Sequence, residues 1–123
     1  MSLPTGDVDL VGLIRALVDI DSTTGREGEV GAWLVRYLRA LGYTVAEQAV
    51  DTGRFNVLAT LDAPEVMFST HLDCVPPFVA SRVEGDRIVG RGACDAKGIA
   101  AAQIAAVERL RRAGERQIGR AHV

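Results

Sequence analysis

The spacing of apolar residues changes along the chain, and this change constrains the fold more than any other feature of the sequence. Over residues 8–18 and 27–41, apolar side chains recur at the spacing of one helix face. Asp7 is placed to cap the first of these helices, and Gly42 follows the second, where a glycine commonly ends a helix. The chain is therefore expected to begin with two amphipathic helices.

Runs typical of strands replace the helical spacing after Gly42. They cover residues 43–50, 56–61 and 66–70. The third run is so apolar that we expect a strand with nearly all of its side chains buried. Residues 82–89 then have the pattern of a short hairpin.

An alanine-rich stretch over residues 96–113 predicts a third helix, and a further strand is expected after it. The apolar side that we expect for this helix consists of Ile99, Ala102, Gln103, Ala106 and Leu110. Helices and strands in this order predict an α/β fold, a layered sandwich in which helices flank a mostly parallel central sheet.

Length, charge and composition exclude several classes of protein. The 123 residues suit one domain, and a net charge of −2 gives no electrostatic reason to expect a nucleic-acid partner. No apolar run is long enough to cross a bilayer, so no membrane association is expected. The N-terminal residues lack the pattern of a signal peptide, so the expected location is the cytoplasm. Cys74 and Cys94 form no CxxC pair, and a disulfide is not expected in that compartment.

His71 and Asp73 follow the third predicted strand directly. Residues two apart on an extended backbone point to the same side, so the Asp73 carboxylate can accept the second N–H of the imidazole and fix its tautomer. This arrangement is typical of a metal-binding histidine. Taken singly, His71 also fits a structural histidine, and Asp73 fits an aspartate that caps a turn.

Asp95 lies between a glycine-rich turn and the alanine-rich helix. It fits either a metal ligand or an N-cap, and the two roles are compatible because a helix N-terminus favours an anion. Lys97, the only lysine in the chain, fits an ordinary surface residue when taken alone. The glycine-rich turn matches neither the dinucleotide-binding fingerprint nor the P-loop, which argues against a nucleotide-binding domain.

Taken together, the two segments are far more specific than either alone. Residues 69–76 (STHLDCVP) and 90–98 (GRGACDAKG) resemble the two signature segments of one enzyme family. That family contains acetylornithine deacetylase, succinyl-diaminopimelate desuccinylase, carboxypeptidase G and related dipeptidases and aminoacylases. The resemblance extends to the two opening helices and to the spacing between the motifs.

The resemblance implies a hydrolase with two Zn²⁺ ions, for which Co²⁺ can substitute. His71 corresponds to the imidazole ligand of one zinc ion, Asp95 to the carboxylate that bridges both ions, and Asp73 to the catalytic-site acid that orients His71. The family's peptide bond after the bridging aspartate, here Asp95–Ala96, is typically cis. The implied reaction is cleavage of an amide bond in an N-acyl amino acid or a short peptide.

Other parts of the family's machinery are expected outside these 123 residues. The general base is a glutamate that follows the next strand, and the remaining metal ligands and a dimer-forming lid domain also come later in the family. Residues 1–117 therefore correspond to the N-terminal part of a catalytic metallohydrolase domain, which we expect to be inactive alone. The substrate cannot be identified from this portion.

Residues 118–123 (IGRAHV) are more polar than the buried strand expected there. The codons ATC GGA AGA GCA CAC GTC would encode them, and this string matches the start of a widely used sequencing adapter. Our hypothesis is that these six residues are translated adapter, in which case His122 is not a ligand. The alternative is a genuine short strand.

Two further classes of function compete with the hydrolase. One is a non-catalytic relative that keeps the fold for binding or assembly. The other is a nucleotide-binding α/β domain, which the glycine-rich turn disfavours. The joint presence of His71, Asp73 and Asp95 favours the hydrolase.

Overall fold

The structure is a computed structural model that describes residues 8–114 and 118–122. Its elements, in chain order, are α1 (Leu10–Val18), α2 (Gly28–Ala40), β1 (Thr44–Asp51), β2 (Arg54–Thr60), β3 (Val66–Thr70), β4 (Arg82–Glu84), β5 (Arg87–Val89), α3 (Lys97–Arg112) and β6 (Ile118–His122).

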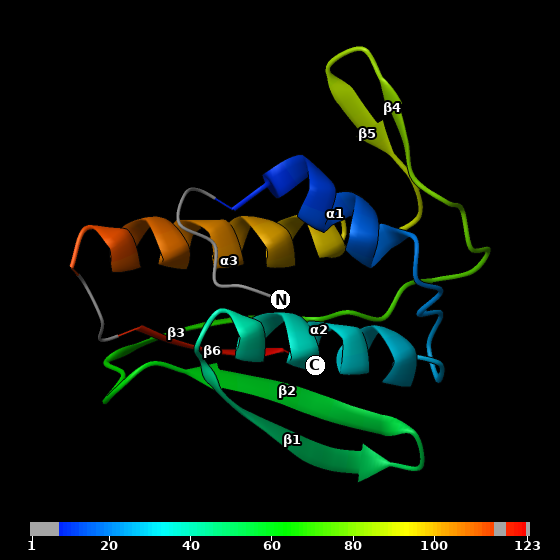
Figure 1. Ribbon diagram of the computed structural model, residues 1–123. Helices are drawn as coiled ribbons and strands as arrows, with labels where there is room; N and C mark the ends of the chain where they lie inside the picture. Colours follow the sequence, from blue (N-terminus) through cyan, green and yellow to red (C-terminus); the bar gives the residue numbers. More distant parts are fainter. Residues whose placement is uncertain (1–7, 115–117, 123) are drawn as a thin grey trace.

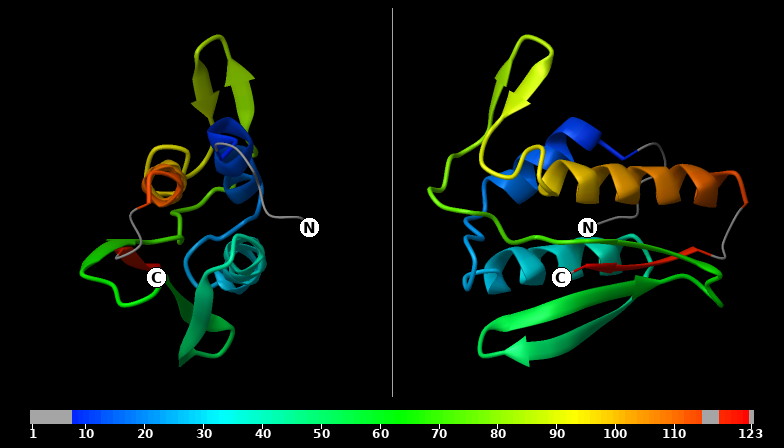
Figure 2. Two further views of the ribbon diagram at one scale, coloured as in Figure 1. Left: turned by 60° about the vertical axis from the view of Figure 1, so that its left-hand side comes forward. Right: turned by 180° about the vertical axis from the view of Figure 1, so that it is seen from behind.

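Helices cover one side of a four-stranded sheet whose strand order is β1-β2-β6-β3 (Figures 1 and 2). Helix α2 packs on β1 and β2, α3 packs on β3, and α1 lies against α3. Strands β4 and β5 form a separate hairpin that projects away from this body (Figure 1). No helix in the described ranges combines the length and the apolarity needed to cross a membrane.

A single apolar core lies between the helices and the sheet. Every helix contributes buried side chains to it, as do β1, β2 and the segment after β3. Its largest completely buried apolar members are Leu17, Leu34, Leu38 and Ile104. Because the core is continuous from α1 to β2, the helices and the sheet are held as one body.

The helices begin close to their predicted positions, with one correction. Helix α1 starts at Leu10, not at residue 8, and its N-cap is Asp9, whose carboxylate accepts the Gly12 N–H at 3.0 Å. The predicted cap, Asp7, lies outside the described residues. Either aspartate satisfies the preference for a capping carboxylate, so the sequence alone did not distinguish them.

The α/β architecture is confirmed, but the described strands do not confirm a mostly parallel sheet. β1 with β2 and β2 with β6 are antiparallel, and only β3 with β6 is parallel. The short connection between β1 and β2 accounts for the first of these pairings, since a tight turn can join only antiparallel neighbours.

The third strand has the predicted bounds but not the predicted burial. The side chains of Val66 and Met67 are 51% and 64% exposed. β3 lies at the edge of the described sheet, and helices cover only one of its faces. The described residues therefore leave apolar side chains of β3 exposed, although its sequence predicted that nearly all of them would be buried.

The expected apolar side of α3 was also wrong. Ile99 and Leu110 are 47% and 39% exposed, whereas the buried side contains Ala100, Ala101, Ile104 and Val107. Alanine and isoleucine occur on both sides of this helix, so the apolar pattern offered little contrast from which to choose the face in contact with the core.

The two isoleucines of α3 provide a test of this assignment. Ile104→Ala should lower the free energy of unfolding by about 2–5 kcal/mol, because it leaves a cavity in the core. Ile99→Ala, on the same helix, should change it by no more than about 0.5 kcal/mol, as is usual for surface positions. Urea denaturation of both variants measures the difference, and equal losses would contradict the assignment of faces.

Candidate metal centre

The three predicted site residues meet at one end of the sheet. His71 and Asp73 follow the carboxyl end of β3, and Asp95 lies just before the first turn of α3. This is the edge at which open α/β sheets collect their ligands. The chain thus brings together residues that are 24 positions apart.

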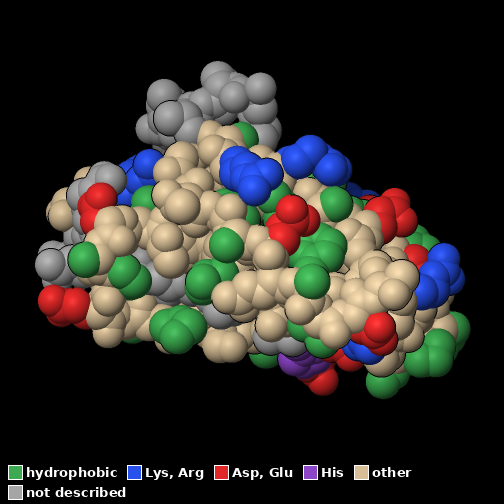
Figure 3. Space-filling model, turned by 90° about the horizontal axis from the view of Figure 1, so that it is seen from below, with side chains coloured by type: hydrophobic (Ala, Val, Ile, Leu, Met, Phe, Trp, Pro, Cys, Tyr) green, Lys and Arg blue, Asp and Glu red, His purple; other side chains and the backbone are tan. Residues whose placement is uncertain are grey.

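The His71 ring lies between two carboxylates. Its Nδ1 is 3.1 Å from Asp73 Oδ1 and 3.2 Å from the Asp73 carbonyl oxygen, and its Nε2 is 3.1 Å from Asp95 Oδ1. The side chains of His71, Asp73 and Asp95 are 45%, 37% and 82% exposed, so the group is accessible from solvent. On the face drawn in Figure 3, a histidine side chain lies at the surface beside acidic side chains.

This geometry has a chemical consequence for the imidazole. A neutral ring has one N–H and one lone pair, yet both nitrogens of His71 face oxygen acceptors. When Nδ1 donates to Asp73, the Nε2 lone pair points toward the Asp95 carboxylate. A metal ion bound at Nε2 would relieve that repulsion. The arrangement therefore favours a cation between His71 and Asp95.

The capping alternative for Asp95 does not describe the structure. The N-cap of α3 is Ala96, and no side chain caps this helix end. The Asp95–Ala96 peptide bond is cis, as the resemblance implies. The carboxylate of Asp95 instead faces His71, which makes it available for a ligand.

Lys97 is not a surface residue. Only 1% of it is exposed, and its Nζ donates to the Ile20 carbonyl oxygen at 2.8 Å. Burial lowers the pKa of its ammonium group, an effect that the negative charges of Asp21 and Asp19 oppose. A buried ammonium needs such partners, so the first turn of α3 is held against the segment that follows α1.

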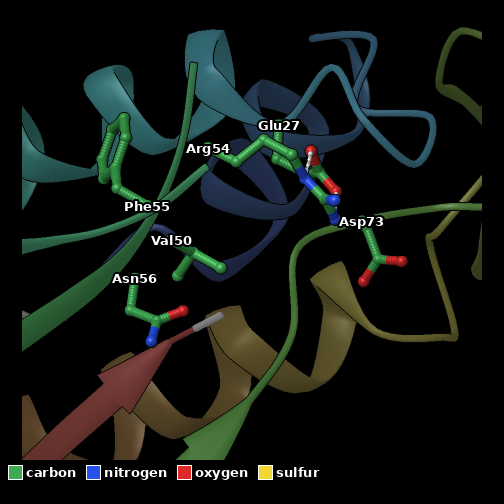
Figure 4. A pocket seen from close by; sticks show the side chains of 6 residues that line it. All are labelled: Glu27, Val50, Arg54, Phe55, Asn56 and Asp73. Carbon is green, nitrogen blue, oxygen red and sulfur yellow. Dashed lines mark hydrogen bonds and ion pairs between the residues drawn. The ribbon is translucent and has the colours of Figure 1, made fainter. Parts of the chain in front are cut away.

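An ion pair beside the site was missed by the sequence reasoning. Glu27 is 8% exposed and accepts two hydrogen bonds from Arg54, from Nε at 3.0 Å and from Nη2 at 2.8 Å. With Asp73 and three further residues, these two side chains line a pocket of about 100 Å³ (Figure 4). Nothing in the local sequence pairs Glu27 with Arg54, which is 27 positions away.

The donors present suit a divalent cation in kind but not in number. An imidazole nitrogen and a carboxylate oxygen are both normal zinc ligands. Among the described residues, however, no group of three or more His, Cys, Asp and Glu side chains is arranged to hold a metal ion. Cys74 is buried and Cys94 exposed, and both are free thiols.

The Glu27–Arg54 pair predicts a pH dependence of stability. Burial alone would raise the pKa of Glu27, but the hydrogen bonds from Arg54 and from the Gly25 N–H outweigh it and lower the pKa below its ordinary value of 4.5. A carboxylate with a lowered pKa contributes stability above pH 4.5 and loses it as the pH falls through the folded-state pKa. Glu27→Gln should therefore lower the free energy of unfolding by about 1–3 kcal/mol at pH 7 and by much less near pH 3.

Urea denaturation at the two pH values measures this dependence. Glu29→Gln, at an exposed position in the first turn of α2, the helix that Glu27 precedes, is the matched control and should have little effect at either pH. A loss for Glu27→Gln that is the same at pH 7 and near pH 3 would contradict the prediction.

Comparisons with known proteins agree with this description. Residues 67–123 match the model of peptidase family M20/M25/M40. A peptidase M20 domain-containing protein of Schizosaccharomyces pombe is 43% identical, over 95% of this chain and 30% of its own length. A probable carboxypeptidase of Aspergillus terreus is 40% identical, over 86% of this chain and 28% of its own length.

A solved structure extends the likeness to three dimensions. A tripeptidase from Staphylococcus aureus superposes with a TM-score of 0.77 at 27% identity, over 92% of this chain and 35% of that protein. The chain thus spans about a third or less of the length of the proteins that it matches. The shared motifs, the fold and these matches show that the chain belongs to peptidase family M20.

Proposed function

We propose that this protein contributes part of the active site of a metal-dependent hydrolase, which cleaves an amide bond in short peptides or N-acyl amino acids. The observation that carries the proposal is the 3.1 Å approach of His71 Nε2 to Asp95 Oδ1, with Asp73 on the other ring nitrogen. The similarity to a carboxypeptidase and a tripeptidase supports peptides as one substrate class.

In this proposal His71 and Asp95 bind the metal ions, and Asp73 orients His71. Zinc, or cobalt in its place, would lower the pKa of a bound water and polarise the scissile carbonyl group. Asp73 accepts a hydrogen bond from the Nδ1–H group and so leaves the Nε2 lone pair free for a metal ion. Asp95 supplies the negative charge that brings a cation to this lone pair.

The rest of the reaction is assigned to residues beyond these 123. We propose that a glutamate from a later segment acts as the general base, and that later carboxylate and histidine side chains complete the coordination. A lid domain that forms a homodimer would shape the substrate pocket. Outside the region that matches this chain, each of these relatives has more than twice as many residues as the chain itself, which leaves room for these parts.

A comparison of two proteins tests the proposal. One is the 123-residue chain, and the other is a gene product that extends it to the length of the relatives. The longer protein should hydrolyse dipeptides, tripeptides or N-acetyl amino acids in the presence of Zn²⁺, and a chelator should stop it. The 123-residue chain should bind Zn²⁺ weakly and hydrolyse none of them, because its ligand set is incomplete.

Two results would refute different parts of this proposal. Chelator-sensitive turnover by the 123-residue chain would show that no later base is needed. A longer protein that binds no metal and cleaves none of these substrates would favour a non-catalytic relative that uses the fold for binding.

Variants of the longer protein test the roles of the two aspartates. Asp73→Ala should lower metal affinity or activity by about 10–100-fold without changing the number of bound ions, because it acts through the imidazole. Asp95→Ala should cost more, because it removes a direct ligand. Metal content and kinetics measure both effects. Equal and negligible losses would mean that neither aspartate serves the site.

The division of the chain into residues 1–117 and 118–123 is also a hypothesis. Backbone pairing places residues 118–122 between β2 and β3 as β6. The adapter hypothesis predicts that the genomic locus encodes a different, more apolar sequence from residue 118 onward. Sequencing the locus decides, and an uninterrupted frame that encodes IGRAHV would refute the hypothesis.

A further inference from the structure

The segment that connects α1 to α2 runs beside the strand end that carries His71 and Asp73. Thr23 and Cys74 form a parallel bridge. The Cys74 N–H donates to the Ser22 carbonyl oxygen at 2.9 Å, and the Thr24 N–H donates to the Cys74 carbonyl oxygen at 3.1 Å. The connector therefore continues the hydrogen bonding of the sheet just beyond the end of β3.

This contact is anchored in the protein interior. Ser22 is 2% exposed, and its hydroxyl donates to the carbonyl oxygen of Leu72, itself 2% exposed, at 2.7 Å. A buried hydroxyl that lost this acceptor would pay the cost of an unmet hydrogen bond. These buried hydrogen bonds therefore hold the connector in a fixed position against residues 72–74.

From this anchored backbone, one side chain reaches the site. The Thr24 hydroxyl donates to Asp73 Oδ2 at 3.0 Å, whereas His71 Nδ1 lies against the other oxygen, Oδ1, at 3.1 Å. The two oxygens of one carboxylate are thus divided between Thr24 and His71. The contact with Thr24 opposes rotation of the carboxylate away from the imidazole.

We propose that Thr24 is a positioning residue, which holds the Asp73 carboxylate so that His71 keeps its proton on Nδ1 and presents the Nε2 lone pair to a metal ion. The tautomer of a histidine is set by the hydrogen bond that its second nitrogen makes. The role in metal binding rests on the proposed function, whereas the effect on the tautomer does not.

The backbone on the other side of Thr24 is restrained as well. Gly25 has φ +98°, a conformation that favours glycine, and its N–H donates to both oxygens of Glu27, at 3.1 and 3.0 Å. Glu27 is in turn held by Arg54. Thr24 therefore lies between two fixed points, and its hydroxyl is oriented before any ligand binds.

Long-range ¹H–¹⁵N NMR spectra of the 123-residue chain test the proposal without any metal. In spectra recorded at about pH 8.5, the neutral ring should show the Nδ1–H tautomer in the wild type, because Asp73 accepts the hydrogen bond of Nδ1. Thr24→Val removes the hydroxyl at nearly constant shape and should shift His71 to a mixture of the two tautomers. Thr24→Ser keeps the hydroxyl and should restore the wild-type pattern.

Controls separate this effect from a loss of structure. Thr52→Val makes the same change at an exposed turn position between β1 and β2 and should leave the His71 tautomer unaltered. Amide spectra report whether each variant is folded, and Thr24→Ala replaces Thr24→Val should valine disturb the loop. A wild-type ring with its proton on Nε2, or a Thr24→Val spectrum identical to that of the wild type, would overturn the proposal.

Zn²⁺ titration of the same variants distinguishes this inference from the proposed function. If both hold, Thr24→Val should weaken Zn²⁺ binding by up to about 10-fold, the lower end of the cost of losing an outer partner, and Thr24→Ser should restore it. A tautomer change with no Zn²⁺ binding in any variant would support the positioning role and count against the metal site. Wild-type Zn²⁺ binding with no tautomer change in Thr24→Val would refute the positioning role alone.

Discussion

The buried ammonium group of Lys97 is the constraint on which the geometry of the site depends. Lys97 is only 1% exposed, so its ammonium group needs a close acceptor, and its Nζ donates to the carbonyl oxygen of Ile20, two residues after the end of α1. Gly92 packs closely against the Lys97 side chain. A Cβ at Gly92 would lie 2.6 Å from Cys74 Sγ and 3.3 Å from Lys97 Cδ. Lys97 thus fixes the start of α3, and this places Asp95, two residues earlier, next to His71.

Features that depend on neighbouring residues in the sequence could be predicted. The apolar spacing located α2 to within one residue and β3 to its observed bounds, because helix and strand periods are local properties. The pairing of His71 with Asp73 follows from the alternation of side chains along an extended backbone, which a separation of two residues satisfies. Asp95 entered the site through the resemblance of its motif to a family, not through any local rule.

Features that depend on distant contacts could not be predicted. Lys97 has no local signal of burial, because its acceptor lies 77 positions earlier in the chain. Glu27 and Arg54 meet only because α2 packs on β2. The same limit explains the error at α3, where the side that packs is chosen by α1 and the sheet and not by the apolar content of the helix.

These contacts divide the site into groups that face a ligand and groups that orient them. His71 and Asp95 come from the end of a strand and the start of a helix, whereas the connector before α2 holds Asp73 and Ile20 holds Lys97. Orientation therefore depends on residues within this chain, although the number of metal donors among the described residues does not reach that of a full site. A donor held in place in advance loses less conformational entropy when a ligand binds, so the contacts that hold the His71 ring would favour the metal ion of the proposed function. If the proposed function holds, the orienting contacts of His71 are the contribution that the described residues make to metal binding.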